Sequence, residues 1–118
     1  MEYQTAEGRR HRITLLTPDG ARAIMVQSGE CIWDAARNAG IDLPAMCHQG
    51  RCLTCAGRIE GPGDYAQTDS DTYFEADRKA GFMLLCTAKA LSDLSVRTHQ
   101  ENEMRRHRLA LNLPAPYA

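Results

Sequence analysis

The chain has 118 residues, a length that suits a single domain with a modest hydrophobic core. Its 14 Lys and Arg and 15 Asp and Glu give a formal net charge of −1, so no global charge attracts it to nucleic acid. No apolar run is long enough to span a bilayer, and the polar N-terminus resembles neither a signal nor a transit peptide. We therefore expect a cytoplasmic protein with no membrane insertion. The plastid stroma is the alternative, if a transit peptide has been removed.

Residues 1–10 are polar and predict a loose N-terminal arm. Strand-forming residues follow at 11–17, and a second stretch at 21–26 alternates toward an apolar face. The residues between them, Pro18, Asp19 and Gly20, have the chemistry of a tight turn. The pattern predicts a β-hairpin.

A helix is predicted from about Glu30 to Gly40, with Ser28 and Gly29 as its cap and an apolar stripe at Ile32, Ala35, Ala36 and Ala39. Trp33 lies off this stripe, so we expect it to be partly exposed or packed against the C-terminal tail. Cys31 stands near the helix start, where a thiol can be activated. A small packed residue is the favoured interpretation of Cys31.

Four further cysteines form the main motif of the chain. Cys47 and Cys52 are separated by four residues, Cys52 and Cys55 by two, and Cys86 follows at the end of the apolar run 82–85. This is the plant-type spacing of a cysteine-bound [2Fe-2S] cluster. Two bridging sulfides supply half of the tetrahedral ligands, so the protein must provide four thiolates. The sequence therefore predicts that these four cysteines bind both irons.

Two other uses of the cysteines fit the sequence less well. Structural zinc sites usually take two closely spaced pairs, whereas here three cysteines share one loop and one stands alone. A disulfide framework fits poorly, because the total of five is odd and no secretory signal precedes it. The iron–sulfur interpretation is favoured, and a structural zinc module remains the alternative that predicts a colourless protein.

The rest of the chain predicts short elements around this motif. Residues 56–59 and 82–85 read as strands, 64–72 as a polar loop, and 73–79 as a short helix. A last strand is expected at 94–98, followed by a helix from Glu101 that Pro114 would end. The tail is expected to pack on the sheet through Leu109, Leu111 and Leu113, or alternatively to mask or add a docking surface.

These segments resemble plant-type [2Fe-2S] ferredoxins of cyanobacteria and chloroplasts. The matching residues are 34–44, 47–57, 81–86, Ser92 with Asp93, and 98–101, in that order. The resemblance covers residues 11–104 and implies a β-grasp, α+β fold, with a mixed sheet, a crossing helix and a cluster-binding loop. It leaves 1–10 as an arm and 105–118 as a C-terminal extension that typical members lack.

The resemblance also implies function. Cys47 and Cys52 would hold one iron, and Cys55 and Cys86 the other, in a single [2Fe-2S] cluster. Four thiolates leave no open coordination position, so we expect a low-potential, one-electron carrier and not an enzyme. The alternative is a redox-sensing or cluster-donating protein that uses Cys31 as a reactive thiol.

The implied partners are photosystem I, ferredoxin–NADP reductase or ferredoxin-dependent enzymes, and a monomer is expected. Residues 60–77 contain six carboxylates and no Lys or Arg, which predicts an acidic patch able to steer a basic partner. Tyr73 or Phe74 is the expected docking aromatic. The match to acidic photosynthetic members weakens elsewhere, because the tail adds Arg105, Arg106 and Arg108 with no acid after Glu103.

Overall fold

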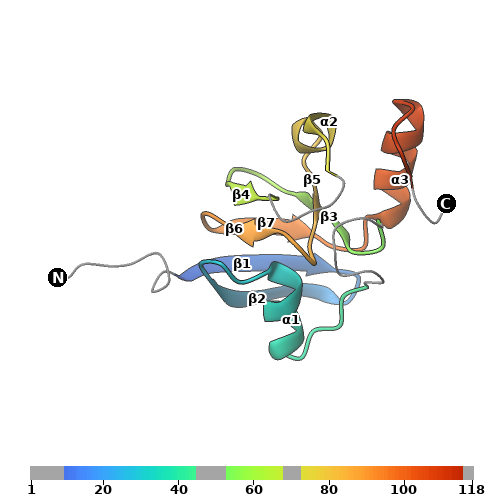
Figure 1. The fold of residues 1–118 in the computed structure, drawn as a ribbon. Helices are drawn as coiled ribbons and strands as arrows, with labels where there is room; N and C mark the ends of the chain where they lie inside the picture. The colour runs from blue at the N-terminus through green and yellow to red at the C-terminus, as the bar shows by residue number, and fades with distance from the viewer. Residues whose placement is uncertain (1–9, 45–52, 68–72, 116–118) are drawn as a thin grey trace.

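The computed structural model describes residues 10–44, 53–67 and 73–115. Figure 1 shows a sheet with one helix, α1, lying across it and two further helices, α2 and α3, projecting beyond it. The strands are β1 (Arg10–Thr17), β2 (Gly20–Gln27), β3 (Ala56–Ile59), β4 (Tyr65–Ala66), β5 (Phe82–Leu84), β6 (Lys89–Ala90) and β7 (Leu94–Arg97). The helices are α1 (Ile32–Asn38), α2 (Glu75–Lys79) and α3 (Glu101–Ala110).

The main sheet has the order β2-β1-β7-β3-β5. β1 pairs with β7 in parallel and with β2 in an antiparallel hairpin, whose register runs from Arg10 opposite Gln27 to Thr17 opposite Gly20. β3 is antiparallel to both β5 and β7. This mixed sheet with a crossing helix is the predicted α+β arrangement. β4 and β6 form a separate two-stranded sheet, which the sequence did not predict.

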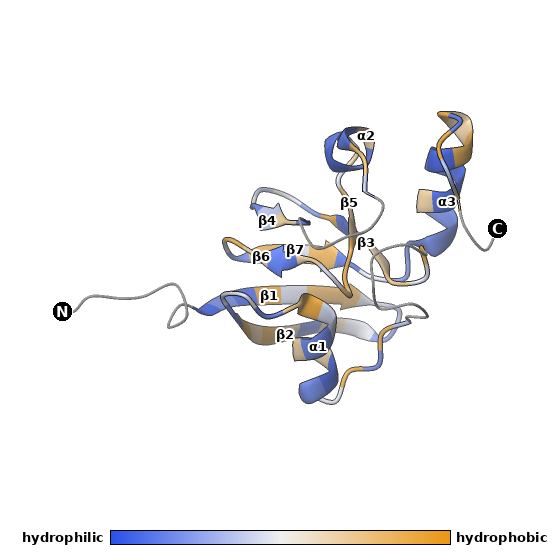
Figure 2. Cartoon of the chain, in the orientation of Figure 1, coloured by the Kyte–Doolittle hydropathy of each residue, from blue (hydrophilic) through white to orange (hydrophobic). Residues whose placement is uncertain are grey.

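The hydrophobic core lies between α1 and the sheet. In the hairpin, Ile13, Leu15, Ile24 and Val26 are buried by the alternation that the sequence predicted. Of the predicted stripe of α1, Ile32, Ala35 and Ala36 are buried, whereas Ala39 is exposed at the C-cap. Figure 2 shows the same alternation of apolar and polar residues along the elements. The core therefore follows directly from the apolar periodicity of the chain.

The start of α1 differs from the prediction. The helix begins at Ile32 after the N-cap Cys31, and no side chain caps it. The expected capping region is used in a turn, in which Glu30 N–H donates to Gln27 O and Glu30 Oε1 accepts from Gln27 N–H. The first helical N–H groups instead reach carbonyls of the segment that contains Cys86. Because these N–H groups already have acceptors, the helix needs no side-chain cap.

The C-terminal helix α3 ends as a Schellman motif before Pro114. Asn112 adopts φ +58°, and its N–H donates to Leu109 O at 3.2 Å. Leu113 N–H donates to Arg108 O at 2.8 Å, which closes the last turn. The predicted helix from Glu101 is confirmed, and this left-handed Asn ends it at Ala110.

The predicted apolar packing of the tail is wrong for Leu109 and Leu111, whereas Leu113 is half-buried. Leu109 is 57% exposed and Leu111 is 49% exposed, and the buried residues of α3 are Met104 and Arg108. In Figure 2 the apolar end of α3 accordingly lies at the tip that points away from the sheet. The tail is anchored by the buried Arg108 and by Ala115, which packs against the core, while Leu109 and Leu111 are exposed.

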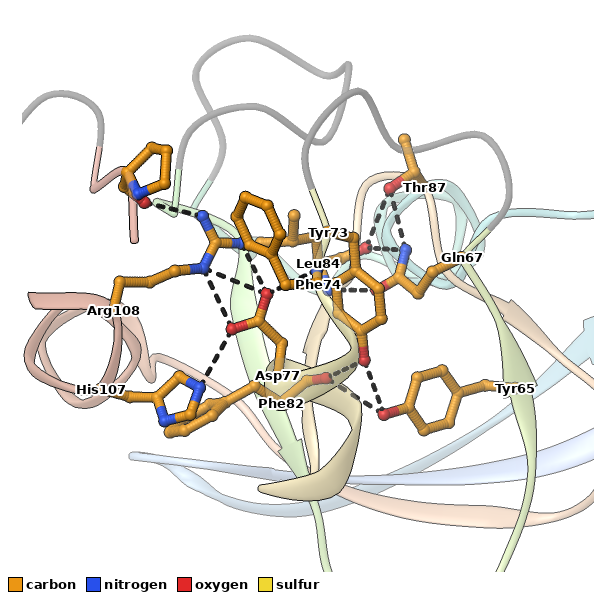
Figure 3. Close-up of polar contacts among 11 residues, drawn as sticks. Tyr65, Gln67, Tyr73, Phe74, Asp77, Phe82, Leu84, Thr87, His107 and Arg108 are labelled. Atoms are coloured by element: carbon orange, nitrogen blue, oxygen red, sulfur yellow. Dashed lines mark hydrogen bonds and ion pairs between the residues drawn. The ribbon is translucent and has the colours of Figure 1, made fainter. Parts of the chain in front are cut away.

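Arg108 and Asp77 form a fully buried ion pair that joins α3 to α2 (Figure 3). Arg108 Nη2 lies 2.9 Å from Asp77 Oδ2, and Nε lies 3.0 Å from Oδ1. The guanidinium also donates to Pro114 O at 2.9 Å and lies 4.8 Å from the centre of the Phe74 ring. Asp77 accepts from Phe74 N–H and lies 3.1 Å from His107 Nε2. Both charges are thus hydrogen-bonded on several sides, as burial requires.

We predict that Arg108→Met lowers the free energy of unfolding by about 3–5 kcal/mol, because the Asp77 carboxylate would stay buried without its cation. The double variant Arg108→Met with Asp77→Leu should recover most of this loss, since no buried charge remains. Urea unfolding followed by circular dichroism under anaerobic conditions measures both. A single variant as stable as the parent chain would contradict the prediction.

Candidate metal centre

Two of the four predicted ligands lie in the described part of the chain, and the structure brings them together. Cys55 precedes β3 directly, and Cys86 follows β5 by two residues. Their sulfur atoms are 3.0 Å apart, and the residues are 1% and 6% exposed. This separation exceeds the about 2.05 Å of a disulfide bond, so the two sulfurs are adjacent and no disulfide joins them. Cys47 and Cys52 lie outside the described residues.

Backbone hydrogen bonds hold the turn that contains Cys86. Leu85 N–H donates to Cys55 O at 3.1 Å, which ties the two ligand segments directly together. On the other side, Ile32 N–H donates to Ala88 O at 2.9 Å and Trp33 N–H donates to Leu85 O at 3.0 Å. The N-terminus of α1 thus satisfies its own donors while it fixes the Cys86 segment.

The residues around Cys55 provide polar donors in a dry environment. Leu53 is fully buried, and its carbonyl accepts from Ala56 N–H in the turn that contains Cys55. Thr54 Oγ1 is buried, and it has no hydrogen-bond partner within the described ranges. A buried hydroxyl next to a ligand cysteine needs an acceptor, and cluster sulfur is one. This part of the site therefore fits an iron–sulfur group.

Trp33 connects α1 to the segment that leads into the cysteine loop. Its indole Nε1–H donates to Leu43 O at 2.8 Å, and the Arg37 guanidinium lies 5.8 Å from its ring centre. The side chain is half-buried, which agrees with the predicted partial exposure. Leu43 is itself buried, so the hydrogen bond fixes the start of the loop against α1.

A family model described as "2Fe-2S iron-sulfur cluster binding domain" matches residues 16–91. Ferredoxin-2 of a Synechococcus strain is 35% identical over 94 residues, which is 80% of this chain and 89% of that protein. This chain belongs to the plant-type [2Fe-2S] ferredoxin family. It has the β-grasp fold of that family, binds one [2Fe-2S] cluster, and is an electron carrier and not an enzyme.

Solved structures agree with the ferredoxin fold. Pectocin M2 matches with a TM-score of 0.71 at 24% identity, over 87% of this chain and 41% of that chain. A cytochrome P450 reductase from Amycolatopsis matches with a TM-score of 0.65 at 27% identity, over 74% of this chain and 25% of that chain. This ferredoxin therefore spans about two fifths of the first protein and a quarter of the second.

The predicted acidic patch of this ferredoxin is smaller than its sequence suggests. Asp77 is fully buried in its ion pair with Arg108, so it contributes nothing to the surface. Glu60 is paired with Arg97 at 3.0 Å, and Asp64 lies 3.8 Å from Arg78. Glu75 is exposed, whereas Asp69 and Asp71 fall outside the described residues.

The two predicted docking aromatics, Tyr73 and Phe74, are half-buried and make internal contacts. The Tyr73 and Tyr65 hydroxyls lie 3.0 Å apart, and both donate to Phe82 O. Burial raises the pKa of each tyrosine, and for Tyr73 the neighbouring Tyr65 raises the pKa further. Both phenols therefore stay protonated at neutral pH and serve as donors.

Sequence reasoning missed Gln67, which it assigned to a polar loop. The structure buries Gln67 beside the Cys86 turn, and Tyr65 just before it is buried as well. An alternation of buried Tyr65 and Gln67 around Ala66 was the available signal, but two residues are too few to reveal a strand.

Of the helices in ranges 10–44, 53–67 and 73–115, none has the length and apolar character needed to cross a membrane.

Proposed function

We propose that Cys47, Cys52, Cys55 and Cys86 are the four ligands of the cluster. The observation that carries this proposal is the 3.0 Å approach of the buried Cys55 and Cys86 sulfurs, which supports their binding to the same iron. Cys47 and Cys52 would then hold the second iron, as the plant-type spacing implies. When bound, the cluster accepts and releases one electron at a low potential.

The protein contributes a dry and rigid setting for this transfer. Leu53, Leu85 and Met83 are fully or almost fully buried around the two described ligands. Burial excludes water, and the Thr54 hydroxyl would offer a donor toward sulfur. A site held by backbone hydrogen bonds also changes little in shape when the charge changes, which favours rapid transfer.

Replacing the two described ligands, Cys55 and Cys86, by serine tests the assignment. We expect Cys86→Ser and Cys55→Ser to bind less than about half of the normal iron, or to lose it rapidly, because an alkoxide or hydroxyl is a poor substitute for thiolate on iron. Cys31→Ser is the matched control and should keep two irons per chain and the parent optical spectrum. Iron analysis and visible absorption measure the outcome. Normal, stable iron content in Cys86→Ser would refute the ligand set.

We propose that the electron donor is a reductase such as ferredoxin–NADP reductase, with photosystem I as the alternative, and that the acceptors are ferredoxin-dependent redox enzymes. The reductase is favoured by the likeness to part of a cytochrome P450 reductase. Because Asp77 is buried and Glu60 is already paired, we expect charge attraction to contribute little to docking on this donor.

This partner proposal predicts weak electrostatic steering. The rate of cytochrome c reduction through ferredoxin–NADP reductase should change by less than about threefold between low and high ionic strength. An acidic photosynthetic ferredoxin, measured in parallel, is the control and should lose at least about tenfold. A loss as steep as that of the control would overturn the proposal.

We also propose that the extension from residue 105 folds with the predicted ferredoxin domain of residues 11–104. The first strand of that domain begins one residue earlier than predicted, at Arg10. Arg108 supports the folding of the extension with the domain, because it supplies the cation for Asp77 of α2. Deleting residues 105–118 would therefore leave the buried Asp77 carboxylate without its cation, whereas Leu109→Gln with Leu111→Gln changes only the exposed surface of the tail.

The proposed compartment is the cytoplasm or the plastid stroma, where thiolates persist as ligands.

A further inference from the structure

Strand β5 is an edge strand of the five-stranded sheet, and side chains satisfy its outer backbone groups. An edge strand presents unpaired N–H and C=O groups along its free side. Here the Tyr65 and Tyr73 hydroxyls donate to Phe82 O (Figure 3). Two residues further along the strand, Gln67 binds both the N–H and the C=O of Leu84. Side chains thus occupy the place of a sixth strand.

Gln67 reproduces a backbone pairing with one amide group. Its Oε1 accepts from Leu84 N–H, and its Nε2 lies 3.4 Å from Leu84 O and 3.1 Å from Thr87 Oγ1. The residue is only 6% exposed, so these bonds form away from water. A buried amide that uses both its oxygen and its NH₂ group is well satisfied and holds a single orientation.

Gln67 binds atoms of Leu84 and Thr87, which lie on either side of Cys86 in the sequence. Leu84 begins the turn, and its carbonyl also accepts from Thr87 N–H at 3.1 Å and from Ala88 N–H at 2.9 Å. Thr87, at the far side of Cys86, contributes its hydroxyl to the same group of contacts. Gln67 therefore closes the turn from outside, while α1 and Cys55 hold it through backbone hydrogen bonds.

We propose that Gln67 is a positioning residue for the iron–sulfur cluster, which holds the Cys86 sulfur beside that of Cys55 by bridging Leu84 and Thr87. The proposal rests on Cys86 being a ligand. Without the amide, the buried Leu84 N–H would lose its acceptor, and the turn could relieve this only by opening toward water. Opening moves the Cys86 sulfur away from its partner and exposes the iron to competing ligands.

Two variants of the full chain with its cluster test this role. Gln67→Leu keeps the approximate volume and removes every hydrogen bond, and we expect iron to pass to a chelator roughly tenfold faster than in the parent protein. Gln67→Glu keeps the acceptor for Leu84 N–H and removes the donor to Thr87, so an intermediate rate is expected. Loss of visible absorption gives the rate, and the EPR g values of the reduced protein report a change of ligand geometry.

Tyr65→Phe is the matched control, because it removes one of two donors to Phe82 O on the same edge strand and leaves the Cys86 turn intact. It should release iron at the parent rate with unchanged g values. Parent rates and g values in Gln67→Leu would overturn the proposal, as would release from Tyr65→Phe as fast as from Gln67→Leu. If Gln67→Leu does not fold, Gln67→Glu and Thr87→Val decide, and parent behaviour in both would overturn it.

The ligand set and the positioning role fail in different ways. Stable iron in Cys86→Ser would contradict the ligand assignment whatever Gln67 does. Parent behaviour of the Gln67 variants, combined with iron loss in Cys86→Ser, would contradict only the positioning role.

Discussion

Antiparallel pairing of Ala56 with Leu84 puts the end of β5 next to the start of β3, and the two described ligand cysteines flank that pair. Gly57, the next residue of β3, leaves room for the neighbouring Val96 and Leu85 side chains. A Cβ there would lie 2.9 Å from Val96 Cγ1 and 3.2 Å from Leu85 Cδ1. The Cys55 and Cys86 sulfurs, 3.0 Å apart, are thus brought together by the sheet register. The described half of the metal centre depends on that register.

Two groups of buried polar contacts stabilise β5, the edge strand that leads to Cys86. Gln67 binds β5 as a neighbouring strand would, and the buried pair of Arg108 and Asp77 joins α3 to the helix that precedes β5. Because these groups are buried and hydrogen-bonded, each is costly to break and specifies one geometry. The C-terminal extension is therefore part of the structure that supports the ligand segment, and its exposed leucines are a separate feature of its surface.

Apolar periodicity and turn chemistry were sufficient to predict the hairpin, α1, β3, β5, β7 and the existence of α3, since each depends on local residue types. The cysteine spacing alone predicted a cluster. Gln67, Asp77 and Arg108 escaped prediction because a polar residue in a short segment is normally solvated. Their burial depends on partners 17 to 31 residues away in the sequence. The predicted side-chain cap of α1 is wrong for the same reason, since the first N–H groups of the helix donate to the carbonyls of Leu85 and Ala88, which are distant in the sequence.

The most direct test of this account is the metal content of the chain, purified under low oxygen, combined with EPR before and after reduction by dithionite. The account predicts two irons per chain, no zinc, a red-brown colour, and a rhombic signal that appears only in the reduced protein. Zinc in place of iron, or a colourless chain after reconstitution with iron and sulfide, would contradict it.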